Sequence, residues 1–405
     1  MIQSNSKQSE SVKLGDVVSF KTGKLNSNAA MPDGAYPFFT CSPETFKTDS
    51  YSFDTECVLL SGNNASGVYS IKYFRGKFDV YQRTYVIRSL DDKRLINHYL
   101  YYALQTKLEL LKSISTGAAT KFLTLTILRD INVELPPLPI QRKIVAILSA
   151  YDDMIESNIQ RIKILEEMAK VIYQEWFVKF HFPGHGNIKM VDSELGPIPE
   201  GWEAQKLSAL VETQYGYTES ASEAEVGPKY VRGMDINKTS YIEWDSVPYC
   251  PIDESDHSKY RLSVGDVLVI RMADPGKVGV VEKEIDAVFA SYLIRLNIKS
   301  ESLSPYYLFY FLLSDRYQGY ITGASTGTTR KSASAGVITD IEMVIPTRDI
   351  REKFEQQIST TRRMLNMLLD KNANLRRTRD MLLPKLISGE LDVEDLDIET
   401  EGLAQ

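Results

Sequence analysis

Ser-Thr-Gly-Ala-Ala-Thr-Lys at 115–121 and Ser-Thr-Gly-Thr-Thr-Arg-Lys at 325–331 are two versions of one heptapeptide, 210 residues apart in a chain of 405. Other matching segments occur in the same order on both sides of it: 57–62 with 266–271, 84–88 with 291–295, 98–104 with 306–312, 130–131 with 340–341, and Pro136 with Pro346. Because the matches keep one order and nearly one offset, the chain is an internal duplication.

The first part of each copy has the pattern of a mixed domain. Short apolar runs at 57–60, 84–88, 267–270 and 292–296 are flanked by Gly, Asn, Asp and Pro, and they predict strands. Segments 95–111 and 304–314, rich in Tyr and Leu, predict helices. The expected fold class is α/β (α+β) in each copy.

The second part of each copy predicts a long helix. Residues 141–180 contain no Gly or Pro, and their apolar residues recur in steps of four and three. The first seam is Ile144, Leu148, Tyr151, Ile155, Asn158, Ile162, Leu165, Ala169, Ile172 and Trp176. The second is Phe354, Ile358, Thr361, Leu365, Leu368, Asn372, Leu375, Arg379, Leu382 and Leu386. These are coiled-coil seams, and each helix would span on the order of 60 Å. Asp349 with Glu352 predicts the start of the second helix, and Ser388-Gly389 predicts its end.

The two seams predict an antiparallel pair. If facing residues have numbers that sum to 530, every layer of one seam meets a layer of the other, from Ile144 with Leu386 to Trp176 with Phe354. Asn158 then faces Asn372, and these are the only Asn residues in either seam. A polar pair in an apolar seam costs stability but fixes the register. Alternatively, both amides lie at splayed, hydrated positions.

The amino-acid composition does not decide whether the protein binds nucleic acid. The formal charge is −7, but residues 390–401 hold seven acidic and no basic residues, so the remainder is neutral. Such a tail is expected to be solvated and disordered. There is no apolar run long enough to cross a membrane, and the first dozen residues lack the apolar stretch of a signal peptide. Three scattered cysteines fit a reducing cytoplasm.

Several motifs together resemble one family. Each domain leads through Pro-x-x-x-x-Gln/Arg-x-Lys, at 136–143 and 346–353, into its long helix. Leu-Gly-Pro-Ile-Pro-Glu-Gly-Trp at 195–202 opens the second copy, and Leu-Leu-Pro-Lys-Leu-Ile-Ser-Gly-Glu-Leu at 382–391 closes it. In this order they resemble type I restriction–modification specificity subunits, over residues 12–392. The first copy departs from the pattern, because Glu10-Ser-Val-Lys-Leu-Gly15 stands in place of a Gly-Trp entry.

The resemblance implies a division of labour. Each mixed domain would be a target-recognition domain for one half of a split, asymmetric site in double-stranded DNA. The helices would set the spacing of the halves and dock two methyltransferase subunits, which restriction/translocase subunits join. The implied segments are recognition domain 1 at 1–140, helix 1 at 141–182, a linker at 183–200, recognition domain 2 at 201–350, helix 2 at 351–391, and an acidic tail at 392–405.

No catalytic motif accompanies this pattern. The sequence has no Gly-rich nucleotide loop, no Asn/Asp-Pro-Pro-Tyr/Phe of amino-methyltransferases and no metal spacing among its four His residues. His181 and His185 are separated by Pro183 and Gly184, so they need not share a helical face. We therefore expect a non-catalytic chain with no cofactor and no metal.

Residues that suit DNA contact gather in a few segments. Loops at 61–67 and 271–277 follow matched strands, and their amide, hydroxyl or guanidinium groups can bind base edges. The repeated heptapeptides suit phosphate contacts. Arg75, Lys77 and Arg83 form a basic cluster with Tyr73 and Tyr81, and Arg232 and Lys238 are weaker candidates. The predicted DNA contacts are Ser61, Asn63, Asn64, Arg75, Lys77, Arg83, Thr120, Lys121, Arg232, Lys238, Arg271, Lys277, Arg330 and Lys331. Alternatively, these residues have no function in DNA binding and belong to ordinary turns and to a solvated face of a strand.

Two other functions stay open at this point. A coiled-coil scaffold would bind proteins through its two domains without binding DNA. A self-contained DNA methyltransferase or nuclease would need cofactor or metal motifs that the sequence lacks.

Overall fold

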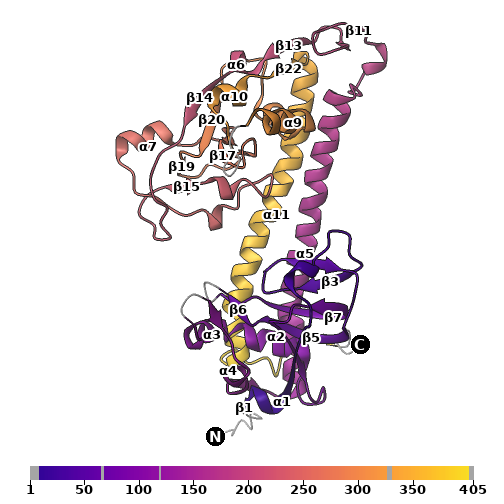
Figure 1. The fold of residues 1–405 in the computed structure, drawn as a ribbon, viewed down its shortest axis with the longest axis vertical. Helices are drawn as coiled ribbons and strands as arrows, with labels where there is room; N and C mark the ends of the chain where they lie inside the picture. Colours follow the sequence, from indigo (N-terminus) through magenta and orange to yellow (C-terminus); the bar gives the residue numbers. More distant parts are fainter. Residues whose placement is uncertain (1–8, 65–67, 118–119, 326–330, 401–405) are drawn as a thin grey trace. The chain divides into compact units, whose positions relative to one another are not determined.

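The computed structural model describes residues 9–64, 68–117, 120–325 and 331–400. The chain forms two compact units (Figure 1): unit 1 is Met1–Glu156 with Asn374–Gln405, and unit 2 is Ser157–Ala373. Each unit contains one mixed domain and one end of both long helices. The predicted fold class of two mixed domains and two long antiparallel helices is confirmed.

Unit 1 is built on a six-stranded sheet of order β2-β8-β5-β7-β3-β4. Its strands are β2 (Val18–Thr22), β3 (Tyr36–Phe39), β4 (Thr45–Thr48), β5 (Phe53–Ser61), β7 (Ile71–Val80) and β8 (Thr84–Ser89). Residues 57–61 of the central strand β5 are all buried. Val58 and Leu60 pack in the same core as helix α2 (Asn97–Gln105), while Cys57 and Leu59 pack with Phe78 on the other face. Burial on both faces explains why this segment is an unbroken apolar run.

Unit 2 is built on a four-stranded sheet of order β14-β20-β16-β18. Its strands are β14 (Val211–Tyr215), β16 (Val267–Ile270), β18 (Val278–Val280) and β20 (Leu293–Ile298), with a separate parallel pair of β15 (Lys229–Val231) and β19 (Ala287–Phe289). Each sheet is followed by two helices where the sequence predicted one. They are α2 and α3 (Leu108–Ile114) in unit 1, and α8 (Pro305–Leu313) and α9 (Asp315–Ala324) in unit 2.

The duplication is visible in matching backbone contacts. In unit 1, β1 (Glu10–Lys13) pairs with β10 (Asn132–Leu135), and in unit 2, β13 (Glu203–Lys206) pairs with β22 (Glu342–Ile345). Short helices α1 (Leu14–Val17) and α6 (Leu207–Leu210) follow β1 and β13, and α4 (Leu125–Arg129) and α10 (Ala335–Thr339) precede β10 and β22. The NH of Leu14 donates to the carbonyl of Ile131 at 2.8 Å, and Leu207 donates to Ile341 at the same distance.

Strand register corrects one of the sequence matches. Leu59 lies opposite Val86, and Leu268 lies opposite Arg295, so equivalent strands are offset by 209 residues. The match of 84–88 to 291–295 is therefore wrong by two positions. A two-residue shift keeps every side chain on its face of the sheet, so the apolar pattern alone cannot reveal it.

The long helices are α5 (Leu138–Tyr173) and α11 (Arg348–Ser388). The end of α11 is as predicted, because the helix stops at Ser388 and Gly389 follows with a φ of 75°. The α-helical part of α5 ends earlier than predicted, at Tyr173, and continues as a π-helical turn, Gln174–Val178. Phe177 of this turn is buried, with its ring centroid 4.8 Å from that of Phe354.

Both helices take part in the core of each unit. In unit 2, Tyr173 of α5 and Ile358 of α11 pack in one cluster with Tyr307 of α8. In unit 1, a second cluster contains Leu148 of α5 and Leu386 of α11, together with the buried face of α2. Neither domain therefore has a complete core without a segment of each helix.

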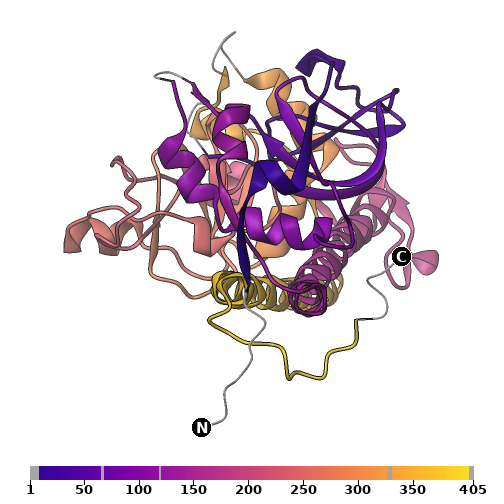
Figure 2. The same ribbon diagram turned by 90° about the horizontal axis from the view of Figure 1, so that it is seen from below.

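The sequence predicted a solvated, disordered acidic tail, but the structure shows that part of the tail is buried. Val393 is 1% exposed and packs in the core of unit 1. The Lys143 ammonium on α5 donates to the carbonyl of Glu394 at 2.6 Å. Figure 2 shows this segment turning from the end of α11 past α5. An apolar residue within the acidic run provides enough burial to hold the first part of the tail.

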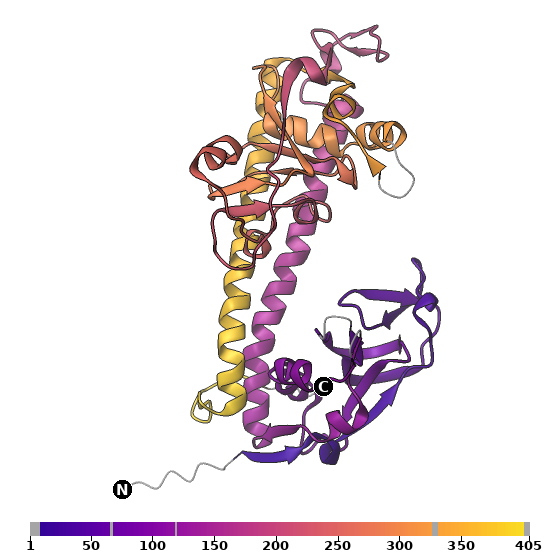
Figure 3. The same ribbon diagram turned by 60° about the vertical axis from the view of Figure 1, so that its left-hand side comes forward.

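The two seam asparagines lie together in unit 2, where α5 and α11 run side by side (Figure 3). The Asn158 amide donates to the Asn372 carbonyl oxygen at 2.8 Å, and the two residues are only 3% and 2% exposed. Their numbers sum to 530. Their role in fixing the register stays a prediction.

A buried ionic network joins the domain of unit 2 to both helices. Arg362 of α11 is fully buried and donates to both carboxylate oxygens of Glu282, at 2.7 and 2.6 Å. Its other terminal NH groups donate to the hydroxyl and the carbonyl of Ser240. The Ser240 hydroxyl in turn donates to Glu166 of α5.

Unit 1 has the opposite charge at the matching position. Asp152 of α5 lies 210 residues before Arg362, and it accepts from the Tyr102 hydroxyl at 2.6 Å and from Arg379 of α11 at 2.5 Å. Tyr102 corresponds to Tyr310 in the repeat. Each domain therefore contacts its helices through polar groups that the other domain does not share.

In unit 1, Tyr102, which donates to Asp152, also belongs to an aromatic stack. The His98 ring lies between Tyr73, at 4.1 Å between centroids, and Tyr102, at 5.1 Å. Burial lowers the pKa of His98 to about 4, against a smaller raising effect of Asp152. The imidazole is therefore neutral in the folded chain at neutral pH.

No helix within the described residues is long and apolar enough to cross a membrane.

We predict that a single Asn158→Leu change lowers the free energy of unfolding by about 1–3 kcal/mol, because it leaves the Asn372 amide buried without its facing partner. The double change Asn158→Leu/Asn372→Leu should restore at least the original stability, while permitting other registers. Urea unfolding of the four variants in a double-mutant cycle measures both effects. Additive losses in the double variant would contradict the pairing.

We also predict acid sensitivity from His98. Its pKa is about 6.5 in the unfolded chain and about 4 in the folded chain, so between these values only the unfolded chain takes up the proton. The free energy of unfolding should fall by about 3 kcal/mol as the pH drops from 6.5 to 4. His98→Phe should remove this part of the pH dependence, and exposed His181→Phe serves as the control. An unchanged pH profile in His98→Phe would show that other groups cause the loss.

Candidate nucleic-acid interface

Two of the predicted contact segments meet in unit 1. Strand β6 (Asn63–Asn64) pairs antiparallel with β9 (Lys121–Phe122), with Asn63 opposite Phe122 and Asn64 opposite Lys121. The NH of Gly62 donates to the carbonyl of Arg83 at 2.8 Å, and the carbonyl of Gly62 accepts from Leu123 at 2.9 Å. We call β6, β9 and Arg83 the first ribbon.

Unit 2 contains the same arrangement. Strand β17 (Met272–Ala273) pairs antiparallel with β21 (Lys331–Ser332). The NH of Arg271 donates to Tyr292 and its carbonyl accepts from Ala333, both at 2.9 Å, so Arg271 takes the place of Gly62. We call β17, β21 and Arg271 the second ribbon. Segments that the sequence offered as separate candidates thus form one element in each unit.

The first ribbon presents amides and cations. Asn63 and Asn64 are partly exposed, and so are Thr120 and Lys121. The Cys41 thiol donates to the Asn63 carbonyl oxygen at 2.9 Å, which leaves the Asn63 NH₂ group to donate elsewhere. The side chain of Ser61 is placed differently. It is 1% exposed and its hydroxyl accepts from the NH of Ser70, so it is not available to DNA.

The predicted cluster of Arg75, Lys77 and Arg83 is divided. Arg75 lies opposite Glu56 on β5, whereas Arg83 precedes Thr84, which lies opposite Ser61. Five strand residues, or about 17 Å, separate these places. Tyr73 shares the strand face of Arg75, but its ring stacks on His98 and its hydroxyl donates to Glu56 at 2.7 Å, so it has a structural role. Only Arg83 therefore belongs to the first ribbon, while Arg75 and Lys77 lie exposed on β7.

The second ribbon presents different side chains. Lys277 and Lys331 are exposed, and Ala273 at the tip of β17 has a φ of 72°, a strained conformation that often accompanies function. Arg330 lies outside the described residues. Arg232 is engaged by Asp235 through its backbone and its guanidinium, so its side chain has a structural role. Lys238 is exposed but belongs to neither ribbon.

Two aromatic residues were missed by the sequence analysis. The Arg83 guanidinium lies 5.5 Å from the Phe122 ring centroid, and that of Arg271 lies 5.0 Å from the Tyr215 ring. Phe122 follows Lys121, so an exposed aromatic residue beside a basic one was a usable signal. Tyr215 lies 56 positions before Arg271, and only the sheet brings them together.

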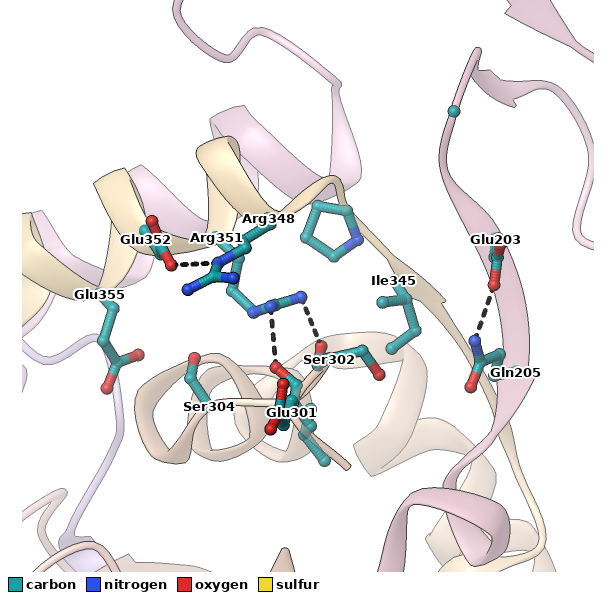
Figure 4. A pocket seen from close by; sticks show the side chains of 13 residues that line it. Glu203, Gln205, Glu301, Ser302, Ser304, Ile345, Arg348, Arg351, Glu352 and Glu355 are labelled. Atoms are coloured by element: carbon teal, nitrogen blue, oxygen red, sulfur yellow. Dashed lines mark hydrogen bonds and ion pairs between the residues drawn. The ribbon is translucent and has the colours of Figure 1, made fainter. Parts of the chain in front are cut away.

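A cavity of about 700 Å³ in unit 2 has a different character (Figure 4). It lies where β13 and β22 meet the start of α11. The Arg351 guanidinium donates to the carbonyls of Glu301 and Ser302 at 2.8 Å each, and Arg348 donates to Glu352 at 2.6 Å. Burial also raises the pKa of Glu355 in its wall. With its cations already bound and several carboxylates in the lining, this cavity is unsuited to phosphate.

Comparisons with known proteins agree with the geometry. Residues 6–167 match the family model described as type I restriction modification DNA specificity domain. The chain is 26% identical over 410 residues to the type I restriction enzyme MjaVIII specificity subunit of Methanocaldococcus jannaschii, which covers 96% of this chain and 94% of that protein. The EcoDI specificity subunit of Escherichia coli is 25% identical over 415 residues, covering 95% of this chain and 89% of that subunit.

The family model and these relatives support a type I specificity subunit. Both relatives are named as specificity subunits, which are the non-catalytic, DNA-recognising subunits of type I restriction–modification systems. The crystal structure of an S subunit from M. genitalium has the same fold, with a TM-score of 0.59, 14% identity, and coverage of 96% of this chain and 98% of that one.

We predict that Lys121→Ala and Lys331→Ala weaken binding to all duplex sequences alike, because lysine contacts phosphate as a point charge. Each change should also reduce the slope of log affinity against log salt concentration by about one. Asn63→Ala should instead relax one base position at a cost of roughly 1–3 kcal/mol. Binding isotherms between about 50 and 200 mM salt separate the two effects. Lys93→Ala, an exposed lysine away from the ribbon, is the control. Equal effects of Lys121→Ala and Asn63→Ala on base preference would contradict the assignment.

Proposed function

We propose that the chain directs a type I restriction–modification complex to a bipartite, asymmetric DNA site, with each unit recognising one half. The observation that carries this proposal is the pair of ribbons. They share the same backbone hydrogen bonds in the two units, yet present different side chains, with Asn63 and Asn64 in the first and Met272 and Ala273 in the second. One frame with two different surfaces suits two different half-sites.

In this proposal, the long helices set the distance between the half-sites. Helix α5 has 36 residues and α11 has 41, which correspond to about 54 and 62 Å. Each helix contributes to the core of both units, so each ribbon is fixed to a rigid element. The buried pair of Asn158 and Asn372 supports this role, since a slipped helix pair would bury unpaired amides.

The helices would also dock two methyltransferase subunits. In unit 2, Ile164, Met168 and Val171 of α5 are about half exposed and line a shallow apolar groove. Exposed apolar residues recur at positions that correspond in the repeat. Met154 corresponds to Met364, and Val171 corresponds to Met381. Apolar groups in water at matched places on both helices support two equivalent docking surfaces. Restriction/translocase subunits would join this complex in the cytoplasm.

Methylome sequencing tests the proposal. The chain is expressed with its methyltransferase subunits in a host without other adenine methylation, and modified bases are mapped. We expect one split motif with two unlike halves at fixed spacing, and no motif when this chain is omitted.

A continuous or palindromic motif would contradict the assignment of one half-site to each unit. Absence of any motif, together with a stable complex that binds no DNA, would favour a protein-binding scaffold instead.

A further inference from the structure

Each ribbon holds the guanidinium of one arginine over an exposed aromatic ring. Arg83 lies over Phe122, which is 36% exposed, and Arg271 lies over Tyr215, which is 44% exposed. The two arginines lie on opposite sides of an equivalent backbone contact, each in its own unit. Gly62 donates to Arg83 in the first ribbon, and at the matching contact in the second, Arg271 donates to Tyr292. Each unit thus has one arginine at this contact.

Other arginines of the chain lie over rings for a structural reason. Arg295 lies over Phe289 but is bound by Asp266, and Arg362 lies over Phe309 but is bound by Glu282. By contrast, neither Arg83 nor Arg271 has a carboxylate partner among the described residues. Their charge is therefore not neutralised within the described part of their units.

The rings themselves are held in place. The Tyr215 hydroxyl accepts from the NH of Ala335 at 3.2 Å, at the start of α10. Phe122 exchanges two backbone hydrogen bonds with Thr116, at 2.7 and 3.1 Å. The Arg271 Nε is buried without a hydrogen-bond partner among the described residues, and Nη1 donates to the Met272 sulfur at 3.6 Å, so the ring and one weak hydrogen bond orient the group. A fixed ring restricts the rotation of the guanidinium that lies on it.

We propose that Arg83 and Arg271 each recognise a guanine in one half-site, and that Phe122 and Tyr215 are their positioning residues. This inference rests on the proposed function. A guanidinium donates two parallel hydrogen bonds to O6 and N7 of guanine in the major groove, a pattern no other base offers. An arginine already held on a ring loses less side-chain entropy when it binds. Lys121 and Lys331 on the same ribbons lack the planar fork and contact phosphate.

The test uses the complex of this chain with its methyltransferase subunits and duplexes that carry its own motif. Each G·C pair of the motif is replaced in turn by A·T, and relative affinities are measured by competition. We expect the unmodified complex to discriminate about 10- to 100-fold at one G·C pair in each half. Arg271→Lys and Arg271→Ala should abolish discrimination at one pair in one half only, and the same changes at Arg83 should act in the other half.

Ring variants distinguish positioning from folding. Tyr215→Leu should reduce discrimination at the same pair as Arg271→Ala, whereas Tyr215→Phe, which keeps the ring, should retain it. Arg232→Lys is the control, because Asp235 already binds that guanidinium. The ratio of two affinities does not depend on how much protein is folded, so a merely structural defect leaves it unchanged.

Two results would overturn the inference. Equal weakening for all duplexes in Arg271→Lys would make Arg271 a phosphate contact, and unchanged discrimination in both arginine variants would remove them from the interface. In either case the unmodified complex still selects its motif and the proposed function stands. If the unmodified complex shows no sequence preference, the proposed function itself fails.

Discussion

The antiparallel packing of α5 against α11 is the constraint on which the rest of the structure depends. Tyr173 and Ile358 take part in the core of unit 2, and Leu148 and Leu386 take part in the core of unit 1, so each domain buries residues from both helices. A domain of this kind cannot complete its core on one helix. Duplication of a domain–helix segment, with the second helix antiparallel to the first, supplies each copy with the partner that it lacks. Apolar residues of the seam, such as Leu148, Ile358 and Leu386, are buried in the two cores, and we propose that the amide pair penalises other registers.

The two units have diverged where their domains contact the helices and where they present the ribbons. Arg362, bound by Glu282, occupies the position that corresponds to Asp152, which binds Arg379 and Tyr102. Exchanging the domains between these positions would bring unlike polar groups together and leave buried charges unpaired, at a cost of several kcal/mol. The backbone of the ribbons is retained while their side chains differ, which is the pattern expected when a scaffold is conserved and its specificity is not.

The sequence predicted those features that rest on long, regular patterns. The duplication, the fold class and the end of α11 at Gly389 follow from repeated strings, helical periodicity and capping residues. The pairing of Asn63 with Phe122 was not predicted, because two strands of two residues have no periodicity. The π-helical turn at Gln174–Val178 and the burial of Val393 also escaped, since both depend on tertiary packing. Among the candidate contacts, burial removes Ser61 and an ion pair occupies Arg232, and neither effect can be read from residue type.

The central claim is that the first ribbon lies on one half of a DNA site and the second ribbon on the other. Site-specific photocrosslinking measures this most directly, with a photoreactive side chain placed at position 121 or 331 and at exposed Arg161 on α5 as the control. The account predicts that crosslinks from 121 map to one half of the motif, those from 331 to the other half, and none arise from 161. Crosslinks from both ribbons to the same half, or equal yields from the control position, would contradict it.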